Sequence, residues 1–140
     1  SVGINIRMQL WKLGLGMFRD HPVLGVGPAN IKTSFKTYHP GPLGIQETWG
    51  SVHSLYLQQM AERGLLGLAA LLALFGGMLA LALKNFRAGS NAYTLWALTV
   101  LPAYYIMNLT EISFQHIHTS FAVFLALAAS TNSVTKRNSA

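Results

Sequence analysis

The sequence predicts an all-α fold, a polytopic membrane helical bundle fragment in which an amphipathic helix and a loop outside the membrane precede about three transmembrane helices. Of the 140 residues, 51% are apolar and only 10% are charged, whereas about a quarter of the residues in soluble domains are charged. The segment from Gly64 to Leu83 carries no charged residue, and its length suits a helix that crosses a hydrocarbon core of about 30 Å. We therefore expect a membrane protein.

The first predicted helix, from Ile4 to Asp20, is amphipathic. Its polar residues step by four and three positions along one face, and they are Asn5, Gln9, Lys12, Gly16 and Arg19. Arg7 lies about 180° from the centre of this stripe, among Ile4, Trp11, Gly14, Leu15 and Phe18. A cation on an apolar face is costly unless an anion pairs with it, so Arg7 is a candidate anion-binding residue. The alternative is a snorkelling arginine whose stem covers apolar surface while its guanidinium reaches water.

A turn and a long loop follow this helix. Pro22 ends the helix, because the residue before a proline is pushed out of the helical conformation. Residues Gly25 to Pro28 predict a plain turn rather than a phosphate-binding loop, since no strand precedes them and no third glycine follows. Residues 29–52 are expected to be a long irregular loop. The aromatic Tyr38 and Trp49 in this loop suit either stacking on sugar rings or resting at lipid headgroups.

His53 is predicted to lie on a helix that leads directly into the charge-free span at 64–83. At 100° per residue, one side of that helix carries His53, Leu57, Met60, Gly64 and Gly67. Glycines on one face let a neighbouring helix approach closely. We therefore expect this face to point into the protein, with His53 just outside the bilayer. A helix-start histidine bonded to the backbone is the alternative.

Short charged loops predict the topology of the rest of the chain. Lys84 and Arg87 follow the first span, and Lys136 and Arg137 lie in the tail, so both segments are expected to be cytoplasmic. Pro102 within the second span is tolerated where neighbouring helices satisfy the freed carbonyl. The expected divisions are an outer region 1–63, spans 64–83, 92–109 and 112–130, a cytoplasmic loop 84–91, an outer turn 110–118 and a cytoplasmic tail 131–140.

Three pieces of the sequence carry a resemblance to a known family. The pattern His53-Ser54, nine residues, Gly64, two residues, Gly67 resembles the histidine motif of the O-antigen ligase and Wzy-type O-antigen polymerase superfamily. The segment R-M-Q-L-W at residues 7–11 is similar to the arginine and tryptophan helix of that family, and D-H-P-V-L-G-V-G-P at 20–28 is similar to its proline and glycine turn. The resemblance leads us to interpret the chain as the C-terminal portion of a longer polytopic protein.

The resemblance implies a glycosyltransferase of the bacterial inner membrane, multi-pass and with its active face in the periplasm. Such an enzyme moves a glycan from an undecaprenyl-pyrophosphate carrier to a hydroxyl of a lipid A-core, glycan or protein acceptor. It implies that His53 acts on the acceptor and that Arg7 binds the pyrophosphate, with no metal or other cofactor. Membrane lipids are further expected partners. The candidate substrate-binding residues are Arg19, Tyr38, Trp49, Glu111 and His116.

Other functions are weighed against this one. A non-enzymatic transporter of lipid-linked glycan would use similar apolar helices and a cationic groove. A membrane metallohydrolase would use histidines near the outer surface, but His116 and His118 would point about 160° apart on a helix and could not chelate one ion. The Lys and Arg residues behind the net charge of +6 are scattered, and their only pairs, Lys84 with Arg87 and Lys136 with Arg137, lie where spans end, so we expect no nucleic-acid partner. The chain lacks cysteine, which excludes disulfides and thiolate zinc sites.

Overall fold

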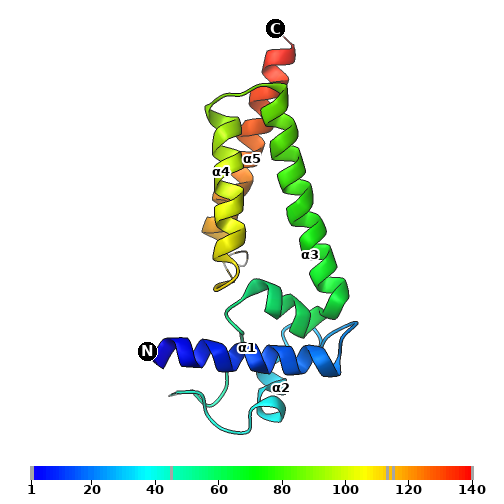
Figure 1. Ribbon diagram of the computed structural model, residues 1–140, viewed down its shortest axis with the longest axis vertical. Helices are drawn as coiled ribbons and strands as arrows, with labels where there is room; N and C mark the ends of the chain where they lie inside the picture. Colours follow the sequence, from blue (N-terminus) through cyan, green and yellow to red (C-terminus); the bar gives the residue numbers. More distant parts are fainter. Residues whose placement is uncertain (1, 45, 113, 115, 140) are drawn as a thin grey trace. The chain divides into compact units, whose positions relative to one another are not determined.

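The computed structural model describes residues 2–44, 46–112, 114 and 116–139, and within them it is built from helices (Figure 1). In chain order these are α1 (Val2–Asp20), α2 (Ile31–Tyr38), α3 (Leu55–Ala88), α4 (Ala92–Met107) and α5 (Ile117–Asn138). Leu43 and Gln46 form an isolated antiparallel β-bridge in the loop between α2 and α3. The predicted all-α fold is confirmed. The chain forms two compact units, Ser1–Leu71 with Leu109–Glu111, and Leu72–Asn108 with Ile112–Ala140.

Two helices within the described residues are long and apolar enough to cross a membrane, Leu55–Ala88 and Ile117–Arg137. The sequence predicts about three spans. The predicted span at 92–109, between the other two, corresponds to α4, which has 16 residues. At 1.5 Å per residue α4 is about 24 Å long, somewhat shorter than a hydrocarbon core. α5 begins at Ile117, inside the segment 110–118 where the sequence places the start of the last span.

The first unit is held together by a small apolar core. α2 packs against α1 and buries Ile31 and Phe35 completely. The core consists of Leu10, Leu13, Met17, Ile31, Phe35, Leu43, Val52 and Ala61. The prediction that residues 29–52 are irregular throughout is wrong, because eight of them form α2. Ile31 and Phe35 are four positions apart, so they share the face of α2 that packs on α1.

The buried face of α1 also differs from the predicted one. Leu10, Leu13 and Met17 are buried, whereas Ile4 is 61% exposed and belongs to the face that the sequence predicts to be apolar. Arg7 lies about one turn before Leu10, so it borders the buried stripe while still facing away from the polar one. This face is buried because α2 and Val52 cover it. Gly14 allows Val52 to approach closely, since an added Cβ there would lie 3.0 Å from Val52 Cγ1.

Helix α3 is broken at Gly64, which adopts φ 60° and ψ −154°. The turn after α1 fits into this break. Val26 N and Gly27 N donate hydrogen bonds to Ala61 O and Glu62 O (2.8 and 3.0 Å). Beyond the break, Leu65 N donates to Pro22 O (2.8 Å). The turn therefore caps both helix ends created by the break, satisfying backbone groups that would otherwise lack partners.

Close backbone approach explains the glycines of this joint. A Cβ at Gly64 would lie 2.3 Å from the carbonyl carbon and oxygen of Val23, and a Cβ at Gly25 would lie 2.3 Å from the carbonyl carbon of Glu62. Both glycines also have positive φ, 60° and 67°, which residues with a side chain adopt at a cost. The predicted role of Gly64 in packing against a neighbouring helix is thus replaced by a role in packing against the 22–25 turn.

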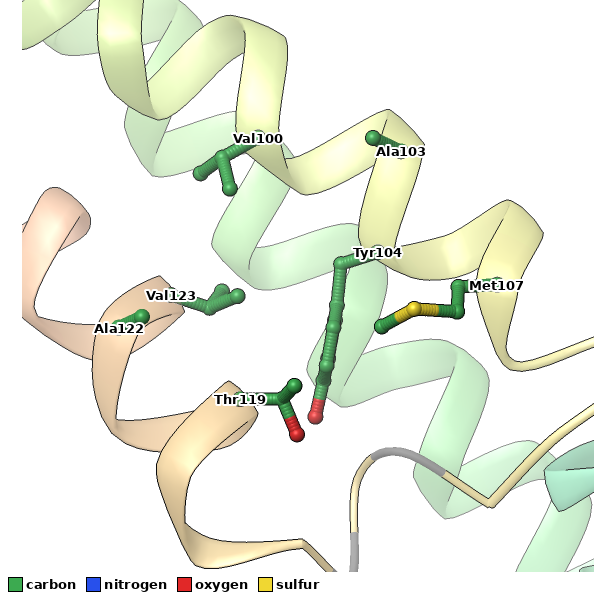
Figure 2. A pocket seen from close by; sticks show the side chains of 7 residues that line it. All are labelled: Val100, Ala103, Tyr104, Met107, Thr119, Ala122 and Val123. Carbon is green, nitrogen blue, oxygen red and sulfur yellow. The ribbon is translucent and has the colours of Figure 1, made fainter.

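In the second unit, α4 and α5 lie side by side (Figure 1). Asn91 caps α4 by accepting hydrogen bonds from Tyr93 N and Thr94 N (2.9 and 3.1 Å). The hydroxyls of Tyr104 and Ser120 lie 2.8 Å apart and join the two helices. Figure 2 shows side chains of α4 and α5 around an apolar hollow of about 210 Å³, lined by Val100, Ala103, Tyr104, Met107, Thr119, Ala122 and Val123. Pro102 lies inside α4.

Candidate active site

The carboxylate of Glu111 joins the two residues that the sequence singles out as catalytic. Its Oε1 lies 2.6 Å from Arg7 Nη2, and its Oε2 lies 3.5 Å from His53 Nδ1. All three residues belong to the first unit. The side chains are 45%, 31% and 38% exposed for Arg7, His53 and Glu111. Ion pairs this open to solvent contribute little stability, so the arrangement is better explained as a polar site accessible to a ligand.

Glu111 is fixed by its backbone as well as by its side chain. Its carbonyl oxygen accepts a hydrogen bond from Leu55 N (3.2 Å), the first residue of α3. The first N–H groups of a helix have no partner within the helix. The segment 109–111 supplies one here, and this contact holds Glu111 against Leu55, two residues after His53.

His53 lies immediately before α3, not on a helix as the sequence predicts. Its φ is 51°, an uncommon value for a residue other than glycine. Its backbone N donates to Ser51 Oγ (3.0 Å), and the edge of its ring meets Trp49 with centroids 5.6 Å apart. The predicted helical position of His53 is wrong because the periodicity of α3 does not extend upstream of the helix start at Leu55. Unusual backbone conformations tend to persist where surrounding contacts hold a functional side chain.

The Nδ1 atom of His53 is buried and has no hydrogen-bond partner among the residues that the structure describes. Glu111 Oε2 faces it at 3.5 Å, slightly beyond the range of a hydrogen bond. A small movement of either side chain would close this distance. The carboxylate therefore stands where it can accept a hydrogen bond from the Nδ1–H group.

A buried polar network that the sequence analysis missed supports the loop next to His53. Val52 N donates to Gln58 Oε1 (3.2 Å), and Gln58 Nε2 donates to Glu62 Oε1 (2.9 Å). Arg63 Nη1 donates to Glu62 Oε2 (3.3 Å). Gln58 and Glu62 are only 4% and 3% exposed. Their spacing of four residues on one helix face was the signal available in the sequence.

Arg7 and His53 line the same hollow, which has a volume of about 210 Å³. Its other walls are Gly3, Ile6, Leu10 and Trp49. The indole N–H of Trp49 donates to Leu43 O (3.3 Å), which fixes the ring between the loop and His53. The hollow thus combines a guanidinium, an imidazole and an aromatic wall.

The remaining predicted site residues lie elsewhere. Tyr38 borders a different hollow with Gln9, Lys12 and His39, and burial, with the hydrogen bond to Asp20 and its charge, raises the pKa of Tyr38. Arg19 is exposed at the end of α1. His116, in the second unit, is the N-cap residue of α5, where its carbonyl oxygen accepts from Ser120 N (3.1 Å) and its side chain makes no capping bond.

Across the described ranges, no three His, Cys, Asp or Glu side chains gather in a way that could hold a metal ion. The site at Arg7, His53 and Glu111 instead combines a guanidinium cation, an imidazole and a carboxylate. Such a set can bind an anion, orient an imidazole and move a proton.

The fold and this site define a helical membrane protein with a polar site next to the start of a candidate span. A family model described as O-antigen ligase matches residues 1–72, more than half of the chain, and the chain belongs to this family. Membership implies O-antigen ligase or polymerase type activity, a glycosyltransferase-like reaction on lipid-linked glycans in a membrane setting. No curated protein and no solved structure matches the chain.

Proposed function

We propose that this protein transfers a glycan from an undecaprenyl-pyrophosphate carrier to an acceptor hydroxyl, with Arg7 at the pyrophosphate and His53 at the acceptor. The observation that carries the proposal is the shared carboxylate of Glu111, which contacts Arg7 through one oxygen and faces His53 with the other. The family match supports the class of reaction.

Arg7 suits the leaving group. An arginine side chain presents five N–H donors and keeps its charge at any physiological pH. Glu111 occupies one donor atom, Nη2, so the rest of the guanidinium fork remains for phosphate oxygens. Charge-assisted hydrogen bonds of this kind stabilise the negative charge that develops as the pyrophosphate departs.

His53 suits the acceptor. With Glu111 facing Nδ1, the favoured neutral tautomer carries its proton on Nδ1 and leaves the lone pair on Nε2. Nε2 can then take the proton of an acceptor hydroxyl. The nearby carboxylate would stabilise the imidazolium formed in this step, a division of labour known from other carboxylate and histidine pairs.

The bonds in this reaction balance without a metal. The acceptor oxygen forms a bond to the anomeric carbon of the first sugar, and the bond between that carbon and the pyrophosphate oxygen breaks. The electron pair stays with the pyrophosphate beside Arg7. The hydroxyl proton passes to His53 and from there to solvent.

The proposal places the site on the periplasmic side of a bacterial inner membrane. Residues 1–63 and 110–118 are then periplasmic, while 84–91 and 131–140 are cytoplasmic. The charged pairs Lys84 and Arg87, and Lys136 and Arg137, support this orientation by the positive-inside rule. Lipid A-core, a second glycan and a protein are the acceptor classes that fit.

An assay in membranes with carrier-linked glycan and acceptor tests the function. The wild-type full-length protein should transfer glycan in the presence of EDTA, and His53→Ala should bind donor without transferring it. A transporter would keep moving substrate in His53→Ala, and a metallohydrolase would stop in EDTA. Either of these two results would overturn the proposal.

A further inference from the structure

A second hollow of about 210 Å³ lies between α1 and α2, and its lining differs from that of the Arg7 and His53 hollow. Its walls are Gln9, Lys12, Leu13, Gly16, Tyr38 and His39. A Cβ added at Gly16 would lie 3.2 Å from Cδ1 of Tyr38. The missing side chain at this position lets the tyrosine ring approach α1 and form one wall of the hollow.

The hydrogen bonds of His39 define the polar side of this hollow. Its Nδ1 lies 2.7 Å from Gly41 O, and its Nε2 lies 3.3 Å from Gln9 Oε1. A neutral imidazole has one N–H and cannot donate to two oxygens. Turning the Gln9 amide so that its NH₂ meets the ring satisfies both contacts of a neutral imidazole, and it leaves the amide oxygen for another partner.

Lys12 brings a positive charge to the same hollow. The ion pairs within the described part of the chain involve Arg7, His53 and Arg63, and none involves Lys12. Asp20, eight positions further along α1, interacts with the hydroxyl of Tyr38. The exposed ammonium of Lys12 is therefore available to an acidic group of a ligand.

We propose that the hollow between α1 and α2 binds a sugar residue that carries a carboxylate or a phosphate. The Tyr38 ring offers an apolar face for the C–H groups of a pyranose, the amide of Gln9 offers a hydrogen bond to its hydroxyls, and Lys12 pairs with its acidic group. This inference rests on the proposed function, because it takes the ligand to be part of the transferred or the accepting glycan.

Direct binding tests the inference with glucose, glucose 6-phosphate, glucuronate and inorganic phosphate as probes. The protein is the purified full-length form with Arg7→Ala, so that anion binding at Arg7 does not contribute. Both anionic sugars should bind about tenfold more tightly than glucose, a difference that ligand-observed NMR resolves. Lys12→Gln should abolish this preference, and Tyr38→Leu should weaken binding of all three sugars. Lys32→Gln, which removes an exposed lysine of α2 outside the hollow, should change nothing.

Equal binding of glucose and its anionic derivatives, or a preference that survives Lys12→Gln, would overturn the inference. So would inorganic phosphate binding as tightly as glucose 6-phosphate, since the sugar would then not be recognised. In transfer assays, competition of glucuronate with the acceptor assigns the subsite to the acceptor glycan, and competition with the donor assigns it to the donor glycan. The binding measurement needs no transfer, so it decides this inference even if the proposed function fails.

Discussion

Glu111 Oε1 lies 2.6 Å from Arg7 Nη2, although 104 residues separate the two positions along the chain. A carboxylate supplied from so far away holds Arg7 and faces His53 at the same time. This relationship makes Glu111 a positioning residue in our account. It also links the activity to the segment 109–111, beyond the part of the chain that the family model matches.

The first prediction concerns this carboxylate. Glu111→Gln keeps the size of the side chain but removes its charge, so Arg7 and His53 lose a common anchor. We expect kcat to fall roughly tenfold to hundredfold, which corresponds to about 1.4–2.7 kcal/mol in the activation free energy. Glu111→Asp, which keeps the charge on a shorter stem, should recover part of the activity. Wild-type kcat in Glu111→Gln would remove Glu111 from the site, and membrane abundance serves as the control.

The second prediction concerns the planar guanidinium group of Arg7. Arg7→Lys keeps a cation but loses the planar fork that pairs with two oxygens at once. Transfer should drop strongly, while the amount of protein in the membrane stays near normal because the Arg7 side chain is 45% exposed. Arg87→Lys is the matched control, an exposed arginine outside the site. Near wild-type transfer by Arg7→Ala would leave only the snorkelling interpretation.

The third prediction concerns the joint at Gly64. Gly64→Ala places a Cβ within 2.3 Å of the Val23 carbonyl and forces a strained φ on alanine, so the turn and the helix break cannot both persist. The strain alone costs on the order of 1–3 kcal/mol, and we expect reduced abundance and a lower Tm in detergent. Gly76→Ala is the control in the same helix, because an added Cβ there meets nothing within 4 Å. Equal Tm values for the two variants would contradict the described joint.

The fourth prediction is topological. Thr37 and Ser139 are exposed, and the chain has no cysteine of its own. With Thr37→Cys or Ser139→Cys, an impermeant thiol reagent applied to intact spheroplasts should label position 37 and not position 139. Labelling at 139 alone would reverse the proposed orientation.

Local sequence signals predicted several parts of the fold correctly. Pro22 marks the end of α1, the glycines at 25 and 27 form the expected turn, and the charge-free run continues in α3. These features depend on neighbours in the sequence, and short-range rules describe them well. The class of fold followed from the same hydropathy pattern.

Features that depend on tertiary contacts were not predictable in this way. Contacts with α2 and Val52 determine which face of α1 is buried. Helix α3 begins at Leu55, so His53 lies outside the helix on which the periodicity placed it. The contact between Arg7 and Glu111 joins residues 104 positions apart, so no local pattern indicates it. Hydropathy carries no information about which carboxylate meets which cation.

His53→Asn tests the central claim most directly, because asparagine tolerates the positive φ found at this position but cannot act as the base. In membranes supplied with carrier-linked glycan and acceptor, we expect transfer to fall on the order of a hundredfold to ten-thousandfold. Binding of the carrier-linked donor should remain, since it is assigned to Arg7. Transfer at the wild-type rate by His53→Asn would contradict the account.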